Sequence, residues 1–82
     1  MPRYFFHVGD GSDPDIEGVE LADLATAKCE AVKVAGHIIC EEAGDFWAKQ
    51  EWAMTVADDS GLTLFTLRVI GMESPAIRNP SD

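Results

Sequence analysis

The alternation of apolar and polar residues near the N-terminus predicts a β-hairpin. Residues 3–8 (RYFFHV) are rich in aromatic and β-branched side chains, which favour a strand. Residues 9–15 (GDGSDPD) are turn formers, and residues 16–21 (IEGVEL) are a shorter strand in which Gly18 marks a bend or bulge. Because neighbouring strand residues point to opposite faces, one face of the first strand carries Tyr4, Phe6 and Val8, and the other carries Phe5 and His7.

A change to helical periodicity predicts one long helix from Asp23 to Gly44. Asp23 is a suitable N-cap, and Gly44 is a suitable stop because it can adopt a positive φ. A stripe about 100° wide is expected to face the sheet, and it consists of Leu24, Ala27, Ala31, Val34, Ala35 and Ile38. A second apolar arc consists of Ala25, Cys29, Val32, Gly36, Ile39, Cys40 and Ala43. The helix therefore has more apolar surface than one packing face requires.

The C-terminal half of the pattern predicts a second hairpin. Residues 45–51 are expected to form a connection that brings Phe46 and Trp47 back onto the sheet or the helix end. Strands are then expected at residues 52–57 (WAMTVA) and 62–70 (LTLFTLRVI), joined by a loop that ends in glycine.

The length of that loop decides the register of the hairpin. If residues 58–61 form the loop, Ala57 lies opposite Leu62 and Met54 lies opposite Phe65. The core face is then Trp52, Met54, Val56, Phe65, Leu67 and Val69, and the outward residues are Leu62, Leu64 and Thr66. A three-residue loop would shift the register by one and exchange the faces of the last strand.

These elements predict an α+β fold of chain order β-β-α-β-β, a four-stranded antiparallel sheet with one long helix packed on one face. Residues 1–70 are predicted to form a single domain, and residues 71–82 a C-terminal tail or arm, because this segment has two prolines and no periodicity. A lone helix leaves its second arc and the outer sheet face uncovered, and apolar surfaces of this kind mark interfaces. The predicted interface of a two-fold homodimer is Cys29, Val32, Gly36, Ile39, Cys40, Leu62 and Leu64. Alternatively, Phe46, Trp47 or the tail folds over the second arc within one chain.

Chain length and composition favour association with another protein. A chain of 82 residues buries only about 60% of its unfolded surface, so oligomerisation would add stability. No apolar run approaches the roughly 20 residues that span a bilayer, and the N-terminus has no secretory pattern. We therefore predict a cytoplasmic protein that does not contact membranes.

The charge balance of fifteen acidic and six basic residues, a net charge of −9, argues against a nucleic-acid partner. An acidic patch around the first turn could instead bind a basic protein, and its residues are Asp10, Asp13, Asp15, Glu17 and Glu20. Residues 13–18 (DPDIEG) resemble the start of an EF-hand calcium loop, but Leu24 stands where the closing Glu is required. An acidic turn is the preferred interpretation.

The residues with catalytic or metal-binding potential are too few to assemble a site. His37 and Cys40 lie one helical turn apart, but no second ligand pair completes a zinc site. Cys29 and Cys40 would stand about 16 Å apart on a continuous helix, too far for a disulfide, so both are predicted to be free thiols. No base or oxyanion site accompanies either thiol, and we predict no enzyme activity, cofactor or metal.

Three sequence motifs resemble those of a family of short bacterial proteins of unknown function. They are M-P-R-Y-F-F-H at the start, D-x-E-G-x-E-L-x-D-L at residues 15–24, and W-x-M-x-V-x-D-x-x-G-x-x-x-F-x-L at residues 52–67. The resemblance implies a compact α+β domain and carries no activity or ligand. The helix departs from the family pattern at Cys29, Gly36 and Cys40.

Together these features predict a small acidic bacterial protein that acts as a non-catalytic protein-interaction module and self-associates. The alternative is a regulatory protein that resembles antitoxins, in which a hairpin and an Ala-rich helix present an acidic surface to a basic partner.

Overall fold

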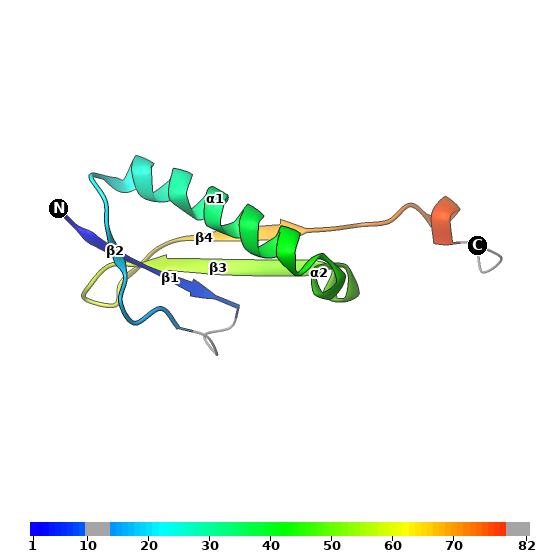
Figure 1. The fold of residues 1–82 in the computed structure, drawn as a ribbon, viewed down its shortest axis with the longest axis horizontal. Helices are drawn as coiled ribbons and strands as arrows, with labels where there is room; N and C mark the ends of the chain where they lie inside the picture. The colour runs from blue at the N-terminus through cyan, green and yellow to red at the C-terminus, as the bar shows by residue number, and fades with distance from the viewer. Residues whose placement is uncertain (10–13, 79–82) are drawn as a thin grey trace.

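A computed structural model describes residues 1–9 and 14–78 and shows an α+β fold (Figure 1). Four strands form one antiparallel sheet in the order β2-β1-β3-β4. In chain order the elements are β1 (Arg3–Val8), β2 (Val19–Glu20), α1 (Leu24–Glu41), α2 (Ala43–Lys49), β3 (Glu51–Ala57), β4 (Thr63–Ile70) and a 3-10 turn, η1 (Pro75–Arg78). The predicted α+β class and the antiparallel four-stranded sheet are confirmed. The chain order is β-β-α-α-β-β, so the predicted order with a single helix is wrong.

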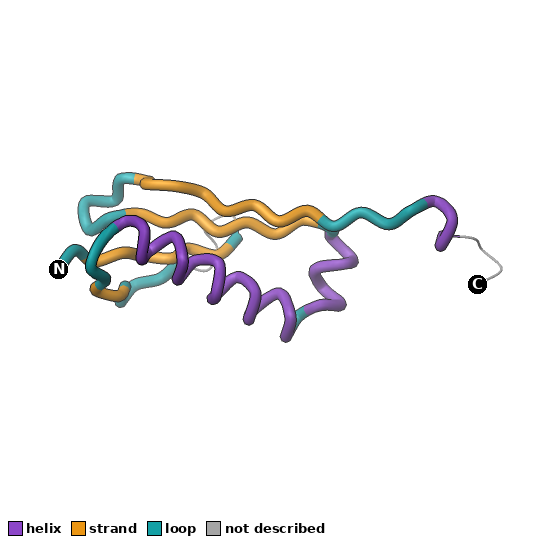
Figure 2. The backbone as a smooth tube through the Cα atoms, turned by 90° about the horizontal axis from the view of Figure 1, so that it is seen from above, coloured by secondary structure: helices purple, strands orange, loops and turns teal. Residues whose placement is uncertain are grey.

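Helix α1 lies across one face of the sheet (Figure 2), and the core lies between the two. Met54 and Val56 on β3 are fully buried, and Tyr4 on β1 is buried beside them. The helix meets these larger side chains with its predicted core stripe, of which Ala27, Ala31 and Ala35 are buried. Small helix residues let the helix backbone approach the sheet closely, so the apolar volume of this core comes mainly from the strands.

The helix predicted from Asp23 to Gly44 is two helices. Asp23 is the N-cap, as predicted, and its carboxylate accepts a hydrogen bond from the Thr26 N–H at 2.8 Å. However, α1 ends at Glu41, and Gly44 lies inside α2 instead of stopping α1. The chain turns at Glu42, which has a non-helical ψ of 40°, and the turn brings the Phe46 ring to a buried position. Burial of this aromatic ring favours the bend over continuation of α1.

The predicted connection at residues 45–51 therefore contains a short helix. A helix of seven residues is too short to be stable alone, so its packing against β3 and α1 must stabilise it. Gln50 ends α2 in the left-handed conformation, with φ of 61°. Its N–H donates to the Phe46 carbonyl at 2.6 Å, which closes the last turn.

The two hairpins differ from the predicted ones in length and register. The strand predicted at residues 16–21 reduces to the two residues of β2. In the second hairpin, Gly61 has a φ of 87°, as the predicted loop requires, but Ala57 pairs with Thr63 and Met54 with Leu67. The predicted pairs of Ala57 with Leu62 and Met54 with Phe65 are thus wrong.

A β-bulge explains why the predicted core face of the second hairpin is nevertheless correct. The register shifts between Val56, which pairs with Phe65, and Ala57, which pairs with Thr63, so Leu64 is the extra residue. The partner of Met54 on β4 is Leu67, two residues later than the predicted Phe65. A shift of two residues keeps the same side chains on the same face of the sheet. The bulge turns Leu64 toward the core, where it packs half-buried, and its predicted outward orientation is wrong.

Candidate interaction surface

An apolar groove lies between α1 and the outer strand β4. Its volume is about 350 Å³, and it is lined almost wholly by apolar atoms of Val32, Ala35, Gly36, Ile39, Cys40, Leu67 and Val69. The sequence places these helix residues on successive turns, at spacings of three and four. The strand residues are two apart and so point to the same face of the sheet.

The structure brings together four of the seven residues predicted to form an interface: Val32, Gly36, Ile39 and Cys40. Cys29 is exposed on α1 but does not line the groove, and Cys40 is also an exposed free thiol. Leu62 is exposed at the end of the second hairpin, and Leu64 packs on the core. Of the predicted interface, therefore, only residues in the C-terminal half of the second helix arc line the groove.

Leu67 and Val69 are groove residues that sequence reasoning assigned to the covered core face. That assignment assumed that one helix covers the whole sheet face. A helix with its side chains is about 10–12 Å wide. In a four-stranded sheet, the axes of the two outermost strands lie about 14 Å apart. Because β4 is at the edge of the sheet, Leu67 and Val69 lie beside α1 and line the groove, and Leu67 also packs against the core. A comparison of these widths could have identified the groove from the predicted elements.

Neither Phe46 and Trp47 nor the described part of the tail, residues 71–78, lines this groove, although both were predicted as possible covers of the second helix arc. Phe46 is buried and Trp47 is half exposed, and their rings meet edge to face with centroids 5.4 Å apart. Both rings lie against Gly71, at the end of β4. The described part of the tail, residues 71–78, extends away from the body (Figures 1 and 2). Within the described residues, the groove is open.

Asp15, a residue of the predicted acidic patch, forms several hydrogen bonds within the first hairpin. Its carboxylate accepts hydrogen bonds from the N–H groups of Phe6, Glu17 and Gly18 at 3.1, 3.2 and 3.1 Å. Its own N–H donates to Nδ1 of His7 at 3.0 Å. Asp15 therefore holds the chain in place before β2, a role that the sequence pattern did not reveal.

These hydrogen bonds also change the acidity of Asp15. Partial burial acts to raise its pKa, but the N–H groups of Gly18, Phe6 and Glu17 together outweigh that effect and hold the pKa below its usual value. The carboxylate is consequently ionised and already bonded within the chain. It is less available to a basic partner than the sequence pattern suggested.

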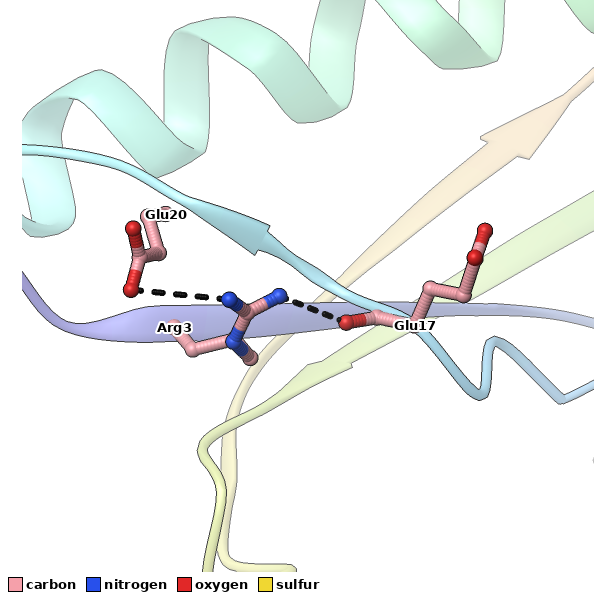
Figure 3. A network of polar contacts seen from close by, with 3 residues as sticks. All are labelled: Arg3, Glu17 and Glu20. Atoms are coloured by element: carbon pink, nitrogen blue, oxygen red, sulfur yellow. Dashed lines mark hydrogen bonds and ion pairs between the residues drawn. The ribbon is translucent and has the colours of Figure 1, made fainter.

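Arg3 joins two other parts of the same hairpin (Figure 3). Its guanidinium donates to the Glu17 carbonyl at 2.8 Å and pairs with the Glu20 carboxylate at 3.5 Å. Glu17 is exposed, and its carboxylate points away from Arg3. Asp10 and Asp13 lie outside the described residues. The acidic patch thus includes two carboxylates, those of Asp15 and Glu20, that bond within the chain.

A second cavity, of about 450 Å³, lies between the end of α1, α2 and the start of β3. Its lining mixes the acidic residues Glu42, Asp45 and Glu51 with Phe46 and Trp52. Across residues 1–9 and 14–78, no three His, Cys, Asp or Glu side chains are grouped closely enough to hold a metal ion. The helices described here also include none with the length and apolarity needed to cross a membrane.

Comparison with known proteins gives one family match. Neither the curated proteins nor the solved structures include a match to this chain. Residues 3–71 match the family described as "Domain of unknown function (DUF6894)". This match spans all four strands and both α-helices and ends at Gly71, where the arm begins. The chain therefore belongs to the DUF6894 family.

Proposed function

We propose that this protein is a non-catalytic interaction module that forms a homodimer through the apolar groove between α1 and β4. The groove is the observation on which the proposal rests. Its walls come from two elements, and Val32 on its rim is 61% exposed. Removing such apolar surface from water is the main favourable term in protein association.

The position of the groove at the sheet edge supports access by a second protein. β4 pairs with β3 on one side only, so the groove opens beside a strand edge that no described strand occupies. Unpaired edges and exposed apolar faces are surfaces that proteins commonly cover by association. A second copy of the chain presents the same edge and groove, which suits a two-fold arrangement.

The antitoxin-like alternative rests on the net charge of −9 and the acidic first hairpin. Its support is weaker than that for self-association, because the carboxylates of Asp15 and Glu20 already have partners within the chain. The groove, in contrast, is apolar and has no occupant among the described residues.

Sedimentation equilibrium of the purified chain tests the proposal. We expect a dimer at micromolar concentrations and a monomer for Val32→Asp, because a buried unpaired carboxylate strongly disfavours association. Ile16→Asp is the matched control: it makes the same type of change at a side chain that is 89% exposed and outside the groove. Its mass should equal that of the parent chain. A monomeric parent chain at high micromolar concentration would refute the proposal.

A further inference from the structure

The described C-terminal arm, residues 71–78, gives the molecule an elongated shape. The radius of gyration is 15.3 Å and the longest dimension is 55 Å. A compact chain of 82 residues has a radius of gyration of about 12 Å. Figures 1 and 2 show that the arm accounts for the extension, since it continues from the end of β4 away from the sheet and helices.

The arm is apolar at two exposed positions. Met72 is 84% exposed and Ile77 is 61% exposed. A local turn shapes the segment between them: Ser74 accepts hydrogen bonds from Ala76 N–H at its side-chain oxygen and from Ile77 N–H at its carbonyl. The arm therefore presents two large apolar side chains to solvent, and their burial would be favourable.

Contacts at Gly71 fix the direction in which the arm leaves the body. The Gly71 N–H donates to the Gln50 carbonyl at 3.0 Å, and the residue is buried. A Cβ at this position would lie 2.8 Å from both the Phe46 and Trp47 rings, so the chain passes closely over them. From this base the arm runs away from the sheet and the helices (Figure 2), and none of its described residues lines the groove of its own chain.

The groove has the size and chemistry to receive such an arm. An apolar cavity of 150 Å³ takes a benzene molecule, so a groove of about 350 Å³ accommodates two side chains of the size of Met and Ile. Space is also available at Gly36, where an added Cβ would have no atom within 4 Å. Groove and arm are adjoining features of one edge of the molecule, because Leu67 and Val69 lie on the strand that leads into the arm.

We infer that the occupant of the groove is the C-terminal arm of a second copy of this chain. The inference rests on the proposed self-association and adds its mode, a reciprocal exchange in which Met72 and Ile77 of each copy enter the groove of the other. In an exchange about a two-fold axis, each groove is filled by the arm of the other copy through the same contacts. Swapping an identical element is a low-cost route to a dimer.

Association of two complementary variants tests this exchange. Met72→Asp combined with Ile77→Asp disables the arm, and Val32→Asp disables the groove. Each variant alone should be monomeric at the micromolar concentrations at which the parent chain is a dimer, with a dissociation constant raised by about tenfold or more. An equimolar mixture should associate more tightly than either variant alone, because one intact arm then meets one intact groove. Circular dichroism should show native secondary structure for both, since all three side chains are exposed.

The outcomes separate this inference from the proposed function. If the arm variant dimerises as tightly as the parent chain, the groove binds another surface, and arm exchange is refuted while self-association stands. If the parent chain is monomeric, both fail. If mixing restores no association, the arm and groove are not partners, and the exchange is likewise refuted.

Thiol cross-linking provides a direct measure of the contact. Cys40 lines the groove, so Ile77→Cys in a Cys29→Ser background should form an intermolecular disulfide between Cys40 and the thiol introduced at position 77. Peptide mapping after mild oxidation identifies that linkage. Ile16→Cys in the same background is the control and should give no such linkage to Cys40. A disulfide joining two Cys40 thiols, or one closed within a single chain, would contradict the exchange.

Discussion

Replacement of Gly18 by alanine should destabilise the protein strongly, because two constraints act at this position. Gly18 has a φ of +69°, and an added Cβ would lie 2.8 Å from the Phe5 ring and 2.9 Å from the Tyr4 carbonyl oxygen. The left-handed conformation costs a non-glycine residue about 1–2 kcal/mol. Relief of the close contact with a backbone oxygen requires a shift of the kind that costs about 1–3 kcal/mol.

The summed loss is about 2–5 kcal/mol, which is large beside the roughly 4–12 kcal/mol expected for a chain of this size. At about 4–8 °C per kcal/mol for a small domain, the melting temperature should fall by at least about 8 °C. Thermal unfolding followed by circular dichroism measures this shift, with urea unfolding as a second measure of the free energy of unfolding.

Gly44→Ala is the matched control for this experiment. Gly44 lies within α2, and no atom lies within 4 Å of an added Cβ there. Because alanine is the better helix former by up to about 1 kcal/mol, this variant should melt at the same temperature as the parent chain or slightly higher. An unchanged melting temperature for Gly18→Ala would show that neither the positive φ nor the approach to Tyr4 constrains the hairpin.

Three further predictions concern the core, the first hairpin and the helix start. Met54→Ala should lower the free energy of unfolding by about 2–5 kcal/mol in urea titrations, because Met54 is fully buried. Ile70→Ala, at an exposed site, is the control and should change the free energy of unfolding by less than about 0.5 kcal/mol. Since the folded-state pKa of Asp15 is lowered, its contribution to stability is present above the ordinary carboxyl pKa of 3.8 and is lost as pH falls through the lower folded value. Asp15→Asn should therefore flatten the fall in stability below about pH 4, and an unchanged slope would contradict the assigned hydrogen bonds. Asp23→Ala should lower the helical circular dichroism signal of the intact chain by fraying the first turn of α1, and an unchanged signal would show that the cap is dispensable.

Elements that depend on neighbours in the chain were predictable here. The Asp23 cap involves a side chain and an N–H three residues away, and the strand alternation around Tyr4 and Phe6 needs only the period of two. The positive φ at Gly61 follows in the same way from the loop that it closes. These features need no knowledge of the rest of the molecule.

The misassigned features depend on contacts between distant residues. Phe46 is buried only because α1 stops at Glu41 and the chain turns toward the sheet. The bulge at Leu64 depends on how β4 pairs with β3, and a loop length alone cannot locate it. Asp15 likewise looked like a surface charge, because its hydrogen-bond partner Phe6 lies nine residues earlier in the chain, on β1.

By itself the sequence determined the α+β class, the main helix with its N-cap, and the apolar excess on Val32, Gly36, Ile39 and Cys40, because local hydrogen bonding and side-chain periodicity encode these properties. Only the tertiary structure decided that this excess forms a groove with Leu67 and Val69. The reason is geometric: α1 is narrower than the four-stranded sheet, and the order β2-β1-β3-β4 leaves β4 at the uncovered edge.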